Sequence, residues 1–172
     1  MLELFYKRRS IRKFTDTPIE AEKLERILQA ALLAPSSKSV YPCEFILVDK
    51  KEINEKLSTC KPHGASFLRN TAYSIIVAGD TNKSDVWIED CAIAATFIQL
   101  QAEQEGLGTC WIQIRKREYN EEQSATSYIR KILKMPTNLQ VLAIIAVGYK
   151  DGEKTGRDET HLKKEKIHRN QF

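Results

Sequence analysis

The sequence has 172 residues, with 27 Lys and Arg, 23 Asp and Glu, and a net charge of +4. That length is typical of one domain whose core is large enough to need no disulfides, and the small positive charge argues against a dedicated nucleic-acid-binding protein. No apolar run approaches the roughly 20 residues that cross a bilayer, and the charged residues 1–14 lack the apolar core of a secretory signal, so we expect a cytoplasmic protein without a membrane anchor.

Hydrophobic patterning predicts helices and strands that alternate along the chain. The expected elements, in order, are a helix at 2–8, an extended segment at 11–14, a helix at 17–34, a strand at 43–48, a helix at 50–60, a strand at 73–79, a helix from 84 or 85 to 105, a strand at 109–114, a helix near 125–133 and a strand at 141–147. The strands are apolar throughout, which is typical of burial on both faces. We therefore expect a three-layer domain, either α/β or α+β, with helices on both sides of the sheet.

Two of these helices carry further signals. The Thr-Pro-Ile-Glu run at 17–20 supplies an N-cap, a proline for the first helical position and a glutamate that can close a capping box. Pro35 predicts that this helix ends near Ala34. The helix at 84–105 has no charge across residues 91–100, so we expect it to be buried on most sides, which favours a partner subunit.

The most unusual stretch is KRRSIRK at residues 7–13, which holds five cations and one serine hydroxyl without an acid. This stretch is either an ordinary solvated surface or a site for one of three kinds of anion. Further basic residues at 115–117 and 163–166 are compatible with a nucleic-acid backbone. An acidic membrane surface lacks support from an acylation signal or an amphipathic helix. The phosphate of a bound cofactor needs only two or three cations and a hydroxyl on a rigid segment.

Two more stretches are candidates for ligand contact. PSSKSVYP at 35–42 is rich in hydroxyls, which suits a polar ligand but also an ordinary loop. GLGTCWIQIRK at 106–116 ends a strand, where backbone N–H groups become available, although a core strand has the same pattern. The GxGxxG fingerprint of dinucleotide-binding domains and the GKS/T phosphate loop are both missing.

Cysteine and histidine spacing does not indicate a metal site. Cys43, Cys60, Cys91 and Cys110 form no CxxC pair, so we expect reduced, buried thiols. The three histidines do not combine with them at zinc-ligand spacing.

The chain resembles the nitroreductase family in four stretches that occur in the same order and spacing. They are RRSIRKF at 8–14, APSSKSVYPCEFILV at 34–48, GLGTCWIQI at 106–114, and AVGY at 146–149 with the tail EKIHRNQF at 165–172. The resemblance covers almost the whole chain. It implies an α+β fold with a mainly antiparallel sheet flanked by helices. It further implies a single domain at 1–172 and an intertwined homodimer, in which the tail from about residue 150 packs on the partner.

The resemblance also implies a function. One FMN would lie in each of two clefts at the dimer interface. The enzyme would take a hydride from NAD(P)H and reduce a nitroaromatic or a quinone, with ping-pong kinetics. A specialised flavin enzyme, such as a dehalogenase or a flavin-consuming enzyme, is the alternative within the superfamily. A flavin-binding or nucleic-acid-binding module without turnover is the alternative outside it.

The family motifs assign roles to particular residues. Those near the FMN phosphate and ribityl chain are Arg8, Arg9 and Ser10, with a cation returned by the tail at Lys154 and Arg157. Those contacting the FMN of the other subunit are Pro35, Ser36, Ser37 and Ser39. Those passing beside the flavin ring, with backbone N–H groups toward N5 and O4, are Gln113, Ile114, Arg115 and Lys116.

Arg12 would reach the N1/O2 edge of the ring. Its guanidinium cannot lose a proton at ordinary pH, so it suits the negative charge that a hydride leaves there. The resemblance implies no catalytic acid or base, because the flavin carries the hydride. Ser39, Tyr41 and Cys43 stand where the family usually has Asn, Gln and Trp. Tyr41 therefore lines the substrate pocket or packs beneath the loop.

Overall fold

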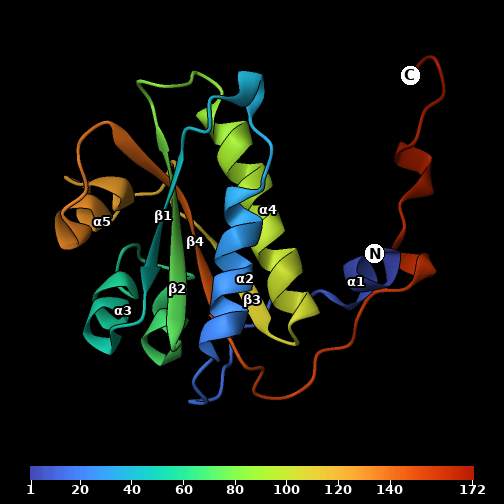
Figure 1. Cartoon of the computed structure of the whole chain (residues 1–172), viewed down its shortest axis with the longest axis horizontal. Coiled ribbons are helices and arrows are strands. Elements are labelled where there is room, and N and C mark those ends of the chain that lie inside the picture. Colours follow the sequence, from blue (N-terminus) through green and yellow to red (C-terminus); the bar gives the residue numbers. More distant parts are fainter.

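Five helices and four strands make up the fold of this computed structural model, which describes residues 1–172 (Figure 1). The helices are α1 (Leu2–Lys7), α2 (Ala21–Leu32), α3 (Lys51–Leu57), α4 (Trp87–Gln104) and α5 (Ala125–Leu133). The strands are β1 (Cys43–Val48), β2 (Tyr73–Asp80), β3 (Gly108–Gln113) and β4 (Leu139–Gly148). Short 3-10 turns lie at Ser37–Ser39, Ser66–Asn70, Glu159–His161 and Lys164–Lys166.

The four strands form one sheet in the order β1-β2-β4-β3, and every pair is antiparallel. This confirms the α+β class, and each predicted strand is present to within two residues. Alternate residues of a strand face opposite sides. Ile75 and Ile145 therefore join a hydrophobic cluster with α2 and α4, while Ile76 and Ile144 join a second cluster with α3 and α5. The sheet is thus covered on both faces, as Figure 1 shows.

The predicted start of α2 is wrong. The helix begins at Ala21 with Glu20 as its N-cap, because residues 17–20 are not helical and Ile19 lies in the core with 4% of its surface exposed. The Glu20 carboxylate does not close a capping box. Its Oε2 accepts a hydrogen bond of 2.6 Å from the Tyr149 hydroxyl, which joins the start of α2 to the end of the sheet.

Other helix boundaries agree better with the prediction or differ for local reasons. α2 ends at Leu32, within two residues of the predicted end near Ala34. α4 begins at Trp87 rather than at 84 or 85, because the Ser84 hydroxyl accepts the Val86 N–H and holds a turn there. Helix boundaries depend on such local side-chain bonds, which hydrophobic periodicity does not report.

The long helix α4 is covered on one side within a single chain. Cys91, Ala95 and Ile98 are fully buried against the sheet, whereas Ile93 and Phe97 are 39% and 37% exposed. Burial on most sides was expected for this helix together with a partner subunit, and one chain leaves the side that carries Ile93 and Phe97 uncovered. None of the helices combines the length and the apolar character that a membrane-spanning segment requires.

Helix α1 and the tail after β4 lie on the same side of the molecule, away from the sheet (Figure 1). α1 contains no buried residue and contacts α4 near the C-terminal end of that helix. Beyond β4 the chain passes α1 and then extends outward, with Leu162, Ile167 and Phe172 exposed (Figure 1). Large apolar side chains on this arm are therefore left without a partner in one chain.

Candidate functional site

The cationic segment at 7–13 is fixed along the edge of the sheet. Ser10 forms a parallel bridge with Thr109 of β3, and the Ile11 N–H donates to the Thr109 carbonyl at 2.8 Å. Phe14 forms an antiparallel bridge with Lys150 just beyond β4. The extended conformation expected for 11–14 is therefore confirmed, and the sheet edge holds the cations on a rigid support.

Two glycines allow this segment to approach closely. Gly108 and Gly148 face each other across β3 and β4. A Cβ added at Gly108 would lie 2.9 Å from Ile11, and one at Gly148 would lie 2.9 Å from Phe14. Because Ile11 and Phe14 are buried on these glycines, the residues between them, Arg12 and Lys13, are exposed.

The tail after β4 returns to the same segment. The Arg9 guanidinium donates to the carbonyl of Thr155. Lys154 Nζ donates to the Ser10 carbonyl at 3.2 Å. The Arg157 N–H donates to the Tyr6 carbonyl at 2.7 Å. A cavity of about 240 Å³ lies between the two segments and is lined by residues 10–13 and 151–154.

Arg12, Lys13 and Lys154 line this cavity, and further cations lie on the two segments that border it, at Arg8, Arg9 and Arg157. The salt bridges within the chain do not include Arg8, Arg9, Arg12, Lys154 or Arg157. Burial raises the pKa of the Cys110 thiol in β3, and Arg12, Lys154 and Arg8 act in the opposite direction, which reflects how near their charges lie to that strand. Cations that form no salt bridge within the chain are suited to an anionic ligand such as a phosphate.

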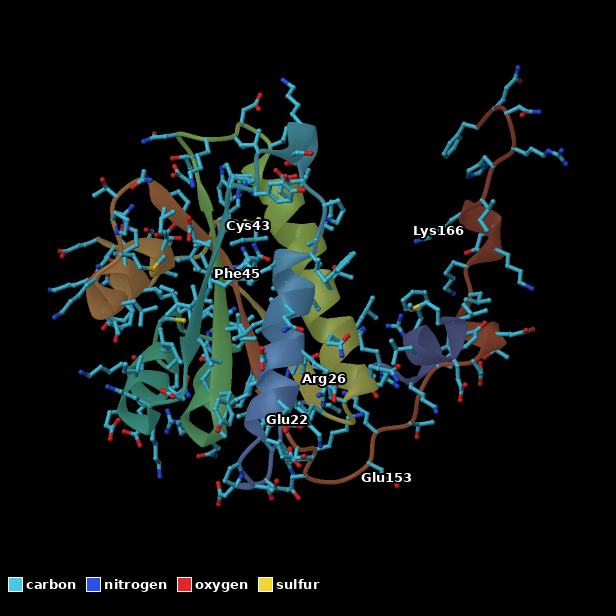
Figure 2. The ribbon with its side chains drawn as sticks, in the orientation of Figure 1. Glu22, Arg26, Cys43, Phe45, Glu153 and Lys166 are labelled. Atoms are coloured by element: carbon cyan, nitrogen blue, oxygen red, sulfur yellow. The ribbon has the colours of Figure 1, made fainter.

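The carboxylates on the return segment are the other charged groups beside the cavity. Asp151 and Glu153 line it together with Lys154. Glu153 lies on the open loop between β4 and the tail (Figure 2). These acids are exposed and form no salt bridge with the cations, so the cluster keeps its positive charge.

The strand end at 113–116 follows β3 from the same edge. The Gln113 amide accepts from Trp111 Nε1 at 2.9 Å and donates to the Arg115 carbonyl at 3.0 Å. The Ile114 and Arg115 N–H groups donate to the Leu142 carbonyl at 3.2 and 3.0 Å and are not available to a ligand, contrary to the expectation from sequence. The Lys116 N–H has no partner, and its residue has a left-handed φ of 57°.

The hydroxyl-rich loop at 35–42 has a strained backbone and a buried anchor. Lys38, Ser39 and Tyr41 all have positive φ, a conformation that is uncommon for such residues and often concentrates at ligand sites. The Ser37 N–H donates to Asp90 Oδ1 of α4 at 2.8 Å. Tyr41 is 56% exposed, so it does not pack beneath the loop.

One chain does not bring the loop and the cations together. The segment at 7–13 leads to the beginning of α2, and the loop follows its end, which separates them by the length of that helix (Figure 1). Twelve helical residues span about 18 Å. The candidate site therefore consists of two parts at opposite ends of α2.

Sequence patterns missed the groups that hold these two parts. Asp90 of α4 has only 3% of its surface exposed, and its Oδ1 holds the loop by accepting the Ser37 N–H. Its Oδ2 has no hydrogen-bond partner. One feature of the sequence could have pointed to Asp90: it is an acid immediately before the charge-free part of α4 at 91–100. The carbonyl of Thr155 left no signal, because every residue type supplies a carbonyl.

Comparison with known proteins identifies the family. The profile described as Nitroreductase family matches residues 6–63 and 58–149. A protein of Archaeoglobus fulgidus, provisionally named NADH dehydrogenase/NAD(P)H nitroreductase, is 34% identical over 99% of this chain and 98% of its own length. The solved structure of an FMN-dependent nitroreductase from Clostridium difficile R20291 is 49% identical, covers 100% of both chains and has a TM-score of 0.99. A nitroreductase family protein from Clostridium novyi NT is 29% identical with a TM-score of 0.78, covering 87% of this chain and 84% of its own. The chain belongs to the nitroreductase family.

Proposed function

We propose that the protein is an FMN-dependent oxidoreductase that takes a hydride from NAD(P)H and passes it to a second substrate in ping-pong order. The observation that carries this proposal is the group of unpaired cations around Ser10, fixed on the edge of β3. The FMN-dependent nitroreductase of Clostridium difficile, which matches over its full length, supports the choice of flavin.

The residues present fit the phosphate end of FMN. Arg8, Arg9 and Ser10 would hold the phosphate and the ribityl chain. The Arg9 guanidinium is already oriented by the Thr155 carbonyl, so less side-chain entropy is lost when it binds. Lys154 lies within hydrogen-bond distance of the Ser10 carbonyl and would add a second cation from the tail. The Arg157 side chain is exposed beside them.

The residues toward the ring end supply charge and one backbone donor. Arg12 would place a permanent positive charge beside the flavin N1/O2 edge, where hydride transfer leaves negative charge. Gln113 and Ile114 would form the wall beside the ring. The Lys116 N–H, which has no partner in the chain, is the backbone group that could donate to the ring. Bound FMN would supply the hydride chemistry, so the side chains need only orient and stabilise it.

We also propose that the site is completed by a second subunit. The loop that carries Pro35, Ser36, Ser37 and Ser39 follows the C-terminal end of α2, whereas the cations precede its N-terminal end, so a second chain would bring the loop to an FMN held by the cations. The uncovered face of α4 and three side chains of the tail, Leu162, Ile167 and Phe172, are exposed apolar surface that a homodimer would bury. We further propose that residues 1–172 form a single domain, with the tail packed on the partner.

For the second substrate we propose a flat aromatic acceptor, such as a nitroaromatic or a quinone. Tyr41 is an exposed aromatic side chain on the loop that would face the partner's FMN. Its ring could stack on an aromatic substrate and select for planar molecules.

The experiment is an FMN titration followed by steady-state kinetics. The purified chain should quench FMN fluorescence at a saturable site, and the loaded protein should oxidise NADH or NADPH in the presence of a nitroaromatic or a quinone. Double-reciprocal plots at several acceptor concentrations should give parallel lines. Failure to bind FMN, or NAD(P)H oxidation no faster than with free FMN, would refute the proposal. Turnover with halogenated aromatic substrates alone would instead indicate a dehalogenase.

A further inference from the structure

Two of the four cysteines are in contact in the folded chain. Cys43 is the first residue of β1, and Cys91 lies in the first part of α4. Their Sγ atoms are 3.3 Å apart, although the residues are 48 positions apart in sequence. Figure 2 labels Cys43 where β1 passes beside α4. All four cysteines are free thiols, and neither Cys60 nor Cys110 has a second sulfur beside it.

The two sulfurs differ in accessibility. Cys91 has no exposed surface. Cys43 is partly exposed, which departs from the buried thiol expected from sequence. It lines a small surface cavity together with Pro35, Ser36 and Tyr41. A small solute that enters this cavity therefore meets Cys43 before it meets Cys91.

They also differ in their tendency to ionise. The hydrogen bond from Cys91 lowers the pKa of Cys43, against the opposing effects of burial and of the nearby carboxylates of Asp90 and Glu44. The same hydrogen bond, together with burial and Asp90, raises the pKa of Cys91. Since the thiolate is the reactive form of cysteine, Cys43 is the attacking group and Cys91 is the resolving group.

We propose that Cys43 and Cys91 form an oxidisable dithiol site, whose substrate is a small hydroperoxide. The Cys43 thiolate attacks one peroxide oxygen, the O–O bond breaks, and the other oxygen leaves with a proton as water or an alcohol. Cys43 is then a sulfenic acid. The Cys91 sulfur attacks the Cys43 sulfur, an S–S bond forms, and water leaves. The two thiols lose two electrons and the peroxide gains them.

This site is linked to the loop at 35–42 from both sides. Cys43 follows the end of the loop directly, and Asp90, the neighbour of Cys91, holds the Ser37 N–H near its beginning. A disulfide would therefore attach both ends of the loop to α4. The inference rests on the two thiols and not on the proposed flavin chemistry, so it holds or fails independently of it.

The test is a thiol count on the full-length protein treated with a few equivalents of hydrogen peroxide. After denaturation in an alkylating reagent, two of the four cysteines should no longer be alkylated. Digestion without reduction should give a peptide pair that joins Cys43 to Cys91, and dithiothreitol should remove it. Four alkylated cysteines after treatment, sulfinic acid at Cys43 with Cys91 still free, or a Cys43–Cys43 link between two chains would each overturn the proposal.

Two variants separate the roles of the sulfurs. Cys91→Ala should leave Cys43 as a sulfenic acid that reacts with dimedone, because the resolving thiol is gone. Cys60→Ala is the matched control, since Cys60 is equally buried but touches no other sulfur, and it should still form the Cys43–Cys91 link. A Cys91→Ala protein that forms no dimedone adduct would contradict the order of the steps. The peptide map of the wild-type protein decides the main point even where a variant folds poorly.

Discussion

Arg12 is exposed on the outer side of the segment that Ile11 and Phe14 fix to the sheet. Its neighbours Asp151 and Glu153 do not pair with it, so its charge is available to a ligand. An anchored cation of this kind needs little reorganisation when an anion binds, which is the property expected of a cofactor ligand.

The substitution Arg12→Ala should weaken FMN binding about 10- to 100-fold, because a hydrogen bond to a charged group contributes about 1.5–3 kcal/mol. Fluorescence titration with FMN measures the change. Lys7→Ala is the control, since Lys7 is exposed and paired with Glu3 at 2.8 Å, and its FMN affinity should equal that of the wild type. Equal losses in both variants would mean that general positive charge, rather than Arg12, attracts the ligand.

Residue types were easier to predict from the sequence than their bonds. The cations and Ser10 stand out because KRRSIRK lacks acids. The involvement of the Arg115 N–H could not be foreseen, because its acceptor is the carbonyl of Leu142, on a strand 27 positions away. Such bonds depend on the register of β3 and β4, which local sequence does not report.

At the scale of elements, the contact of Phe14 with Gly148 joins the cationic segment to the sheet. Gly148→Ala should destabilise the protein by about 1–3 kcal/mol, since the new Cβ would lie 2.9 Å from the Phe14 ring in a packed core. Urea unfolding measures this value. In a Phe14→Ala background the same substitution should cost less, because the ring is gone. An equal loss of unfolding free energy in both backgrounds would show that the contact between the added methyl group and the Phe14 ring is not the cause of the destabilisation.

The ion pair between α2 and α4 gives a pH-dependent contribution to stability. Arg26 Nε and Nη2 each donate to Glu105 at 2.8 Å, and Gln101 donates to the same carboxylate. The Arg26 hydrogen bond lowers the pKa of Glu105 from its ordinary value of 4.5 (Figure 2 labels Arg26 on α2). A lowered folded-state pKa means that the stabilisation is present above pH 4.5 and is lost as the pH falls through the lowered value.

The prediction for this pair concerns Glu105→Gln. Its urea midpoint should lie slightly below that of the wild type at pH 7, and the difference should disappear as the pH falls below 4.5 and through the lowered pKa of the wild-type carboxylate, which is then protonated. Glu44→Gln is the control, because Glu44 pairs with Lys83 at 3.6 Å in an exposed position and should change little at either pH. A Glu105→Gln difference that stays constant from pH 7 to pH 3 would contradict the role of charge.

Strands were predicted better than helix starts, for a physical reason. A buried strand such as β4 is marked by a continuous apolar run, and tertiary packing preserves it. The start of α2 had strong local signals at 17–20, but burial of Ile19 and the bond between Glu20 and Tyr149 overrode them. Tertiary contacts therefore decided the boundary against local propensity.

At the scale of the whole molecule, the proposed site requires two chains. The cations and the loop at 35–42 lie at opposite ends of α2, and the uncovered side chains Ile93 and Phe97 lie on the helix beside it. In a twofold dimer each site would take its cations from one chain and its loop from the other. The sequence indicated this through the charge-free stretch of α4 and through the family resemblance, which implies a site shared by two chains.

The measurement that tests this account most directly is the FMN content of a mixed dimer. One chain carries Arg8→Ala and Arg12→Ala, and the other carries Ser37→Trp at an exposed position of the loop. Neither variant should hold FMN by itself. Co-expressed with two different tags and purified through both, the mixed dimer should hold about one FMN, because one of its two sites combines the intact cations with the intact loop. A mixed dimer without FMN would place the cations and the loop of each site in one chain, and mixed chains that never associate would contradict the dimer itself.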